Sequence, residues 1–381
     1  MANLFFVPMD DLVYMYAIAE IFKYNPLASR QLIDTVENLP ALFSISPDEL
    51  ESILGYGTAL KEKFLNGEVL ETACREIEWA KSRGVKVLSV KSEEYPALLK
   101  ECPDSPAVLF YIGSADISTG CNVSVVGTRL ASAYGRQATS RVVADLAEQQ
   151  GMEAENRIRI VSGLAYGIDT AAHRKALEMG LETIGVLPCG IDLIYPKSHR
   201  EIAREMVRQG GVITEFPHGT DVRRWQFIKR NRIIAGLSAS TIAVETRIKG
   251  GSMSTVEFAN SYGRDVYAVP GRLGDFNSFG CNYLISRNIA QIYTKESATQ
   301  ICNAGRCVVP DWGSDINLFS FQSDKKEKIL LSLKNNLTLD TDGVCNLVGI
   351  PFDEAAALLL EMELEGTIVL TQCQRYKLRC K

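Results

Sequence analysis

The chain has 381 residues, of which 46% are hydrophobic and 23% are charged, and its formal net charge is −5. This composition is that of an ordinary globular protein, and the length is enough for two or three domains. The acidic balance excludes a uniformly basic nucleic-acid binder, but it allows a local basic face.

No run of apolar residues approaches the roughly 20 that cross a bilayer, and the first residues lack the basic start of a secretory signal. The ten cysteines form no C-x-x-C pair and no Cys/His cluster. We therefore expect a cytoplasmic protein with free thiols, no membrane span and no metal site.

Residues 1–80 predict a small helical domain of the SAM or helix-hairpin type. Leu12, Tyr16 and Ala19 recur at near-helical spacing, and Ser-Pro-Asp-Glu at 46–49 is typical of a helix start. Leu-Gly-Tyr-Gly at 54–57 is typical of a break between two helices. Such domains bind DNA or dock onto proteins, and the sequence leaves both interpretations open.

Residues 81–302 predict an α/β domain built on an extended, Rossmann-like, doubly wound sheet. Two approach strands are expected at 85–90 and 107–112. Further apolar runs each lead into a polar turn and then a helical pattern, which indicates parallel strands joined by crossover helices. These runs are 123–126, 158–161, 183–187, 212–214, 241–244 and 265–269. Ligands of such sheets bind outside the carboxyl ends of the strands.

The turns after these strands predict an anion site without a nucleotide cofactor. The chain has neither G-x-G-x-x-G nor G-x-x-x-x-G-K-[ST]. Ser162, Gly163 and Gly167 belong to a turn between a strand and a helix, where glycines let the backbone approach an anion and the helix N-terminus offers free amides. The alternative is that these glycines only make a tight turn.

Cations gather at the same strand ends. Arg129 and Lys197 follow the first and third strands of the sheet and are expected to bind phosphate. Residues 190–250 hold eleven Lys and Arg against six Asp and Glu. Trp225 and Phe227 lie among these cations, as in a groove for single-stranded nucleic acid, where bases stack on aromatic rings. The alternative is that at least one of the two rings belongs to the core.

The sequence contains no strong catalytic motif. The three histidines, His173, His199 and His218, have no metal-ligand spacing. Glu245 and Glu257 flank a Gly-Gly-Ser turn, and this segment resembles the P-G-G-x-G-T-x-x-E motif of the lysine-decarboxylase-like phosphoribohydrolases, with altered spacing. A Rossmann-like nucleotide phosphoribohydrolase is therefore the alternative function.

Residues 303–324 are expected to be a linker, and 325–381 a winged-helix-like domain. Helical patterns at 326–333, 341–348 and 352–365 precede a β hairpin. The third helix is acidic, which favours a contact with protein over the reading of DNA. Its acids are Asp353, Glu354, Glu361, Glu363 and Glu365.

Seven ordered motifs in the central region together resemble the DNA-processing protein A family (DprA, also called Smf). They are V-V-G-T-R (125–129) with S-x-Y-G (132–135), S-G-L-A-Y-G-I-D (162–169), G-I-D-L-I-Y-P-K (190–197), T-E-F-P-H-G (214–219), F-I-K-R-N-R-I-I-A-G-L-S (227–238), G-G-S-M-S-T (250–255), and V-P-G (269–271) with S-x-G-x-N-x-L-I (278–285).

The resemblance implies a Rossmann-like domain that binds single-stranded DNA without sequence preference. It also implies a homodimer, which hands the strand to the RecA recombinase in natural transformation (competence) or related recombination and is not an enzyme. By motif match, the principal phosphate ligands are Arg129 and Lys197, and the anion turn is Ser162, Gly163 and Gly167. Arg230, Asn231 and Arg232 are expected to line or brace the groove.

The sequence departs from the family pattern at two places. The family usually has Asn-Phe-Pro where this chain has Gln226-Phe227-Ile228, before the Arg-Asn-Arg segment. It usually has Gly-Ala where this chain has Asn288-Ile289. The second departure lies in the part of the domain that we associate with the dimer and with partner contacts.

Overall fold

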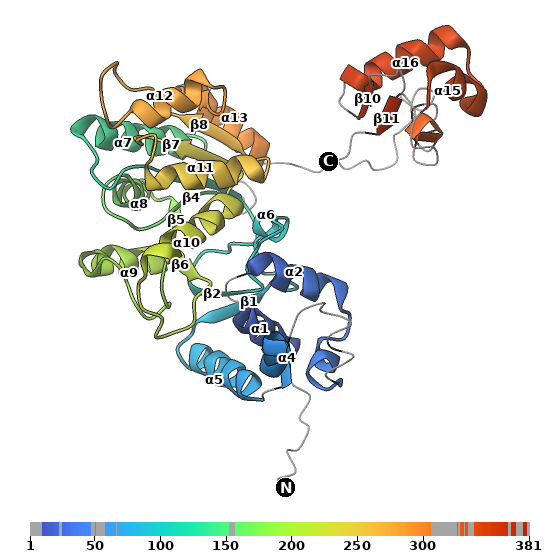
Figure 1. Ribbon diagram of the computed structural model, residues 1–381. Coiled ribbons are helices and arrows are strands. Elements are labelled where there is room, and N and C mark those ends of the chain that lie inside the picture. The colour runs from blue at the N-terminus through green and yellow to red at the C-terminus, as the bar shows by residue number, and fades with distance from the viewer. Residues whose placement is uncertain are drawn as a thin grey trace. The chain divides into compact units, whose positions relative to one another are not determined.

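The computed structural model describes residues 10–22, 25–46, 50, 58–65, 67–151 and 157–305 and, further along the chain, 326, 328–330, 332–333, 339–364, 367–370 and 376–378. The chain divides into two compact units, Met1–Cys307 and Val308–Lys381 (Figure 1).

The first unit is built on a nine-stranded sheet, in the order β1-β2-β6-β5-β4-β3-β7-β8-β9. The strands from β6 to β9 in this order are parallel, and β1 and β2 continue the sheet beyond β6 as antiparallel strands. This confirms the predicted extended Rossmann-like sheet. The strands are β1 (Lys86–Ser89), β2 (Val108–Gly113), β3 (Cys121–Val126), β4 (Ile158–Ser162), β5 (Glu182–Val186), β6 (Gly210–Thr214), β7 (Ser240–Ala243), β8 (Asp265–Ala268) and β9 (Gln291–Ile292).

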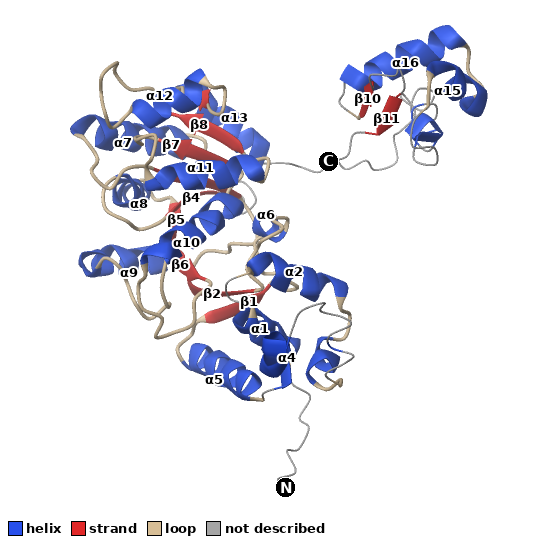
Figure 2. Ribbon diagram, in the orientation of Figure 1, coloured by secondary structure: helices blue, strands red, loops and turns tan. Residues whose placement is uncertain are grey.

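Helices cover both faces of this sheet (Figure 2), which is why its central strands read as continuous apolar runs. Val123 and Val125 pack on one face with α7, α8 and α13. Val126 packs on the other face with α10. The helices are α6 (Ala97–Lys100), α7 (Ala133–Ala147), α8 (Ile168–Glu178), the 3-10 turn η3 (Lys197–His199), α9 (Arg200–Arg208), α10 (Arg224–Leu237), α11 (Gly251–Ser261), α12 (Phe279–Ser286) and α13 (Lys295–Gly305).

The N-terminal helices share one hydrophobic core with the antiparallel edge of the sheet. Tyr16 of α1 meets Phe110 of β2 edge-on, with ring centroids 6.1 Å apart. The expected helical character is therefore confirmed where it is described, whereas the break at 54–57 and most of the helix start at 46–49 lie outside the described residues. These elements are α1 (Asp11–Ile21), α2 (Pro26–Thr35), the 3-10 helix η1 (Leu39–Phe43), α4 (Thr58–Leu65) and α5 (Glu68–Ser82).

The second unit contains α15 (Thr341–Val348), α16 (Phe352–Leu364) and an antiparallel hairpin of β10 (Ile368–Leu370) and β11 (Tyr376–Leu378). Asp340 caps α15, because its carboxylate accepts a hydrogen bond from the amide of Gly343 at 2.9 Å. The helices and hairpin lie where the sequence predicts them, and the winged-helix class stays a prediction.

One predicted boundary is wrong by a helical turn. Residues 303–305, expected to begin the linker, are the last turn of α13, so a linker begins no earlier than 306. The rest of the predicted linker lies outside the described residues.

Two features of the described part of the chain bear on membranes and metals. No helix there is long and apolar enough to cross a bilayer. No group of three or more His, Cys, Asp or Glu side chains there could hold a metal ion.

Candidate nucleic-acid interface

A cleft lies at the switch point of the sheet, where the order in which strands are added changes from one side of β3 to the other. Strand β3 lies between β4 and β7, so the connections from these strands leave toward opposite sides. Such a switch point opens a crevice at the carboxyl ends of the strands. Here the crevice is a cleft of about 390 Å³ between the turn after β3, the turn after β7 and helix α10. We call it the switch-point cleft.

Arg129 and Phe227 meet at the mouth of this cleft. The guanidinium carbon of Arg129 lies 4.7 Å from the centroid of the Phe227 ring, a cation–π contact. Phe227 in turn meets Tyr195 edge-on, with centroids 5.8 Å apart. Lys197 follows two residues after Tyr195, and both predicted phosphate ligands are exposed. The structure therefore connects Arg129 to the Lys197 turn through two aromatic rings.

Two exposed tyrosines were missed as candidate site residues by the sequence analysis. Tyr166 and Tyr195 lie on the turns after β4 and β5, at the same edge of the sheet. The Tyr166 hydroxyl lies 2.9 Å from the hydroxyl of Ser198, next to Lys197. The sequence feature that could have indicated them is a large aromatic residue inside a turn, because a ring in a turn is not needed to fill the core.

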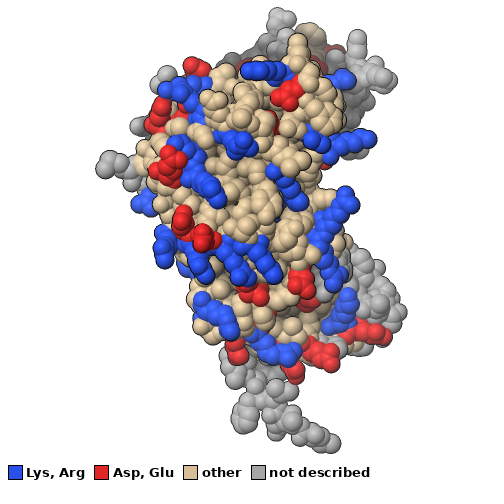
Figure 3. Space-filling model, turned by 90° about the vertical axis from the view of Figure 1, so that its left-hand side faces the viewer, with Lys and Arg blue, Asp and Glu red and all other residues tan. Residues whose placement is uncertain are grey.

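A second group of cations lies along the turn after β7. Arg247 and Lys249 line the switch-point cleft. The Arg247 guanidinium lies 4.5 Å from the ring centroid of Phe276 and donates to the side-chain oxygen of Asn277 at 3.3 Å. Figure 3 shows the molecule from the left-hand side of Figure 1, and blue Lys and Arg side chains are spread across that face.

The predicted anion turn is already occupied by a carboxylate of the chain itself. Asp169 Oδ2 accepts hydrogen bonds from the amides of Gly163 at 3.2 Å and Ala165 at 3.3 Å. Ser162 is fully buried, and its hydroxyl donates to the carbonyl of Val125 at 2.6 Å. The Ser162 hydroxyl and the Gly163 amide are therefore already bonded within the chain, which disfavours direct contacts from these two donors to a phosphate. Direct phosphate binding by this turn stays a prediction.

The glycines of this turn serve close packing. A Cβ on Gly163 would lie 1.9 Å from Nη1 of Arg230. Gly167 has a φ of +81°, and a Cβ there would lie 2.2 Å from the carbonyl oxygen of Thr128. Both positions require glycine, so the tight-turn alternative holds for them, and the turn helps to place Arg129 by packing against its backbone.

Arg230 is a buried brace rather than a surface ligand. It is 3% exposed and donates to the carbonyl of Val186 at 2.6 Å. Burial raises the pKa of Asp169, and the nearby Arg230 opposes that rise. Burial lowers the pKa of Arg230 to about 10, and Asp169 opposes that fall. The two buried charges therefore stabilise each other in the wall of the switch-point cleft, which both residues line.

Asn231 and Arg232 are likewise buried and already have partners. The amide of Asn231 donates to the carbonyl of Gly251 at 3.1 Å, which ties α10 to the start of α11. Arg232 forms an ion pair with Glu215 at 2.5 Å and also donates to the carbonyl of Asp104. Asn231 lines the switch-point cleft together with Arg230, whereas Arg232 is turned toward the core and braces α10, so the expectation that these residues line or brace the groove agrees with their positions. Direct binding of phosphate by them stays a prediction.

The candidate hydrolase residues do not form a site. Glu245 is completely buried and accepts hydrogen bonds from the backbone amide of Ser132 at 2.9 Å and from its hydroxyl at 2.5 Å. It therefore fixes the start of α7. Glu257 lies on the exposed face of α11. The phosphoribohydrolase alternative loses the carboxylates on which it depended.

The three histidines contact other groups of the fold. His173 is buried and lies 2.7 Å from the hydroxyl of Thr183, and His199 lies 2.9 Å from the carbonyl oxygen of Leu164. His218 pairs with the carboxylate of Glu76. None of these rings faces the switch-point cleft.

Comparison with known proteins gives a consistent result. The sequence profile of the family described as DNA recombination-mediator protein A matches residues 86–304. The DNA processing protein DprA of Streptococcus pneumoniae (strain ATCC BAA-255 / R6) is 34% identical over 256 residues, which are 63% of this chain and 88% of that protein. Protein Smf of Escherichia coli (strain K12) is 31% identical over 297 residues, 76% of each chain.

Two solved structures are similar to the same part of the chain. The X-ray structure of DNA processing protein A from Streptococcus pneumoniae matches with a TM-score of 0.57 and 31% identity, covering 75% of this chain and 92% of that one. DNA processing protein A from Helicobacter pylori, a protein with a single-stranded DNA binding mode, matches with a TM-score of 0.51 and 27% identity, covering 57% and 96%.

The profile covers more than half of the chain, and the relatives share both its sequence and its extended Rossmann-like fold. The family consists of DNA-binding recombination mediators rather than enzymes. This chain belongs to the DprA/Smf family of DNA recombination-mediator proteins.

Proposed function

We propose that this protein binds single-stranded DNA without reading its sequence and loads the RecA recombinase onto it, in the cytoplasm, during natural transformation or related recombination. The observation that carries this proposal is the exposed contact of Arg129 with Phe227 at the mouth of the switch-point cleft. Neither Arg129 nor Lys197 has an ion-pair partner among the described residues. Both cations are therefore available to phosphates.

The physical mechanism is neutralisation of phosphates together with stacking of bases. Arg129 and Lys197 contact successive phosphates, which releases counterions and makes the affinity depend steeply on salt. Bases stack on exposed rings such as Tyr166 and Tyr195, and every base offers a π-face, so sequence does not matter. A duplex hides these faces inside its stack and binds less well.

We further propose that the working form is a homodimer. Its support is an apolar surface on the loop before α12 and at the outer edge of the sheet. Leu273 is 98% exposed, Phe276 is 59% exposed and Ile292 is 50% exposed. Strand β9 is the last strand of the sheet, so one of its edges is unpaired among the described residues. Exposed apolar groups and an open strand edge each favour association with a second copy.

The first test is fluorescence anisotropy of the full chain with a labelled oligo-dT and with a duplex of equal length, over a salt series. We expect tight binding of the single strand, weak binding of the duplex and a steep fall of affinity with salt. Absence of single-strand binding at low salt would contradict the proposal, and the strand-end cations would then serve a small anion.

RecA loading and dimerisation need separate measurements. Loading predicts that the protein speeds the DNA-dependent ATPase of RecA on single strands coated with single-strand-binding protein. An unchanged ATPase lag would contradict loading and leave DNA binding intact. For the dimer, sedimentation velocity is expected to show twice the chain mass, and Ile292→Glu is expected to return the mass to that of one chain.

A further inference from the structure

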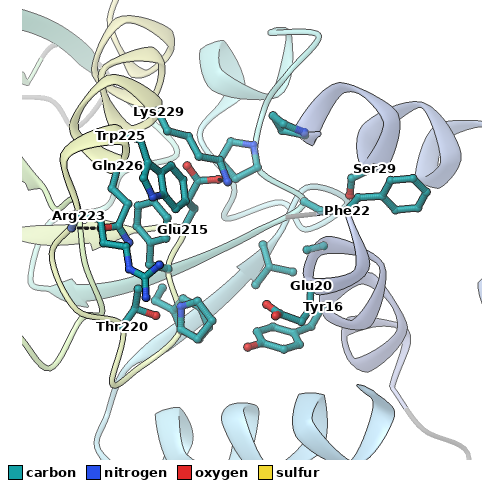
Figure 4. Close-up of a pocket in the computed structure, with 18 of the residues that line it drawn as sticks. Tyr16, Glu20, Phe22, Ser29, Glu215, Thr220, Arg223, Trp225, Gln226 and Lys229 are labelled. Carbon is teal, nitrogen blue, oxygen red and sulfur yellow. Dashed lines mark hydrogen bonds and ion pairs between the residues drawn. The ribbon is translucent and has the colours of Figure 1, made fainter. Parts of the chain in front are cut away.

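A second pocket lies on the other side of the N-terminal end of α10. It is a cavity of about 350 Å³ between helices α1 and α2 and the turn from β6 into α10 (Figure 4). Trp225 and Phe227 are two residues apart on α10, so their side chains leave the helix in different directions. Phe227 contacts Arg129, whereas Trp225 lines this second pocket. We call it the α10 pocket.

The walls of the α10 pocket are aromatic. Trp225 is 40% exposed and meets Phe216 edge-on, with ring centroids 6.0 Å apart. In Figure 4, Tyr16 lies on the opposite side of the pocket from Trp225. Aromatic walls of this kind suit a flat ring, which gains by stacking against an indole.

Two polar atoms in the walls have no hydrogen-bond partner among the described residues. They are the hydroxyl oxygen of Ser29, whose residue is 3% exposed, and Oε1 of Glu215, whose side chain is 8% exposed. The other oxygen of Glu215 is held by Lys229 at 3.2 Å and by Arg232 at 2.5 Å. Buried polar atoms are nearly always satisfied in folded proteins. Both atoms are covered by the pocket walls, so a ligand completes their bonding once a small shift of the walls uncovers them.

The charges of the pocket exclude a phosphate from its interior. Glu20, Glu215 and Asp221 line it together with Arg223 and Lys229. A phosphate inside would face these carboxylates. At the rim, Arg223 is exposed and precedes the first turn of α10, where the helix dipole favours an anion. The arrangement therefore suits a neutral ring inside and a phosphate outside.

We propose that the α10 pocket takes one unpaired nucleobase that carries an exocyclic amino group. This inference rests on the proposed single-strand binding. The ring stacks against Trp225, the amino group donates to Oε1 of Glu215, and the Ser29 hydroxyl donates to an acceptor of the ring. The attached phosphate lies by Arg223. Uracil and thymine are disfavoured, because they turn a carbonyl oxygen toward the carboxylate where cytosine turns its amine.

The test compares oligo-dC with oligo-dU of equal length, since these bases differ by an amine exchanged for a carbonyl oxygen. The full chain is expected to bind oligo-dC roughly ten- to hundredfold more tightly, the size of one hydrogen bond to a charged group. Trp225→Leu and Ser29→Ala are each expected to reduce this preference to within about twofold. Phe227→Leu is the matched control, and it weakens both strands equally while the preference stays.

The outcomes separate this inference from the proposed function. Equal affinity of the unaltered protein for both strands, or a preference that survives Trp225→Leu, overturns the inference and leaves single-strand binding standing. If neither strand binds, the proposed function fails, and the pocket is tested alone with cytidine and uridine monophosphate. Quenching of tryptophan fluorescence by the cytidine nucleotide, lost in Trp225→Leu, would support a free nucleotide as the occupant. No quenching would overturn the pocket as a base site.

Discussion

The guanidinium of Arg230 lies directly against the backbone of Gly163, so that a Cβ at residue 163 would meet Nη1 of Arg230 at 1.9 Å. The contact joins helix α10 to the turn after β4, and these two segments are far apart in the sequence. Beside it, Asp169 closes the same turn by accepting its amides. The turn, the buried arginine and the buried aspartate together form the support on which the exposed Arg129 rests.

The first prediction concerns the space at Gly163. Gly163→Ala is expected to lower the free energy of unfolding by about 1–3 kcal/mol, because the added methyl group displaces a buried arginine that has no free room. The measurement is urea denaturation followed by circular dichroism.

Gly251→Ala is the matched control for that substitution. Gly251 also lies at a strand-to-helix turn, but a Cβ there meets nothing within 4 Å. Its stability is expected to stay within about 0.5 kcal/mol of the unaltered protein. Equal stability of the two variants would contradict the packing role assigned to Gly163.

The second prediction concerns the exposed cations. Arg129→Ala combined with Lys197→Ala is expected to weaken oligo-dT binding by roughly tenfold or more at low salt, and to reduce the slope of log affinity against log salt by about 1.4, which is about 0.7 for each lost phosphate contact. The thermal midpoint should not change, because both side chains are exposed.

The control for the cations removes the same charge elsewhere. Arg204→Ala combined with Arg208→Ala takes two exposed cations from the later part of α9, away from the strand-end turns. This variant is expected to keep nearly the full affinity and salt slope. A similar loss in both double variants would mean that net charge, rather than the site, governs binding.

The third prediction concerns the pH dependence of stability. Burial, and then the nearby Arg230 and His199, lower the pKa of His173 to about 3. The Thr183 hydroxyl donates to the carbonyl of Ile160 and therefore accepts from Nδ1 of His173, which fixes the proton of the neutral ring on Nδ1. An unfolded histidine has a pKa of about 6.5. Below that value the unfolded chain binds the additional proton, so this contribution is complete above about pH 6.5 and is lost as the pH falls.

The measurement is the free energy of unfolding at pH 7.5 and pH 5.5, taken for the unaltered protein and for His173→Gln. His173 alone is expected to cost about 1.4 kcal/mol over this interval. Between pH 7.5 and pH 5.5, the free energy of unfolding of the glutamine variant should therefore fall by about 1.4 kcal/mol less than that of the unaltered protein, because the two proteins share all other titrating groups. Parallel pH profiles for the two proteins would show that His173 is protonated in the folded state.

The fourth prediction concerns the contact between the N-terminal helices and the sheet. Glu76 of α5 is buried and accepts from the backbone amide of His218 at 2.7 Å and from its ring. The His218 ring also stacks on Trp79, with centroids 4.2 Å apart and an angle of 9°. Glu76→Ala removes two hydrogen bonds to a buried carboxylate and is expected to cost about 1.5–3 kcal/mol.

Limited proteolysis is the matching measurement for the N-terminal helices. We expect Glu76→Ala to expose sites in residues 1–82 to cleavage earlier than in the unaltered protein. Glu78→Ala removes an exposed carboxylate from the same helix and should leave the cleavage rate unchanged. If both variants are cut at the rate of the unaltered protein, Glu76 does not hold the helices to the sheet.

A departure from the family pattern finds its physical reason in the backbone. Asn288 stands where the family usually has glycine, and its φ is +53°. Asparagine is among the few residues other than glycine that accept this left-handed conformation, so the turn that ends α12 is kept. At the other departure, the Gln226 side chain accepts from the amide of Arg223 and caps the start of α10.

The sequence by itself determined the sheet and the exposed cations. Apolar runs with polar turns report burial on both faces of a strand, and this signal is local, so the strands from β1 to β8 lie close to their predicted positions. Arg129 and Lys197 are exposed at the strand ends where the sequence places them, because a charged side chain at a strand end stays in water unless a partner takes it.

Only the tertiary structure decided which polar residues face the interior. The sequence predicts that Ser162 binds an anion and that Arg230, Asn231 and Arg232 line or brace the groove, and in the folded chain each meets a partner from another segment, such as Val125 for Ser162 and Glu215 for Arg232. Local sequence patterns carry no information about these distant partners. The same limit hid the α10 pocket, because its walls come from helices α1 and α2 and from the turn before α10, which only the folded chain brings together.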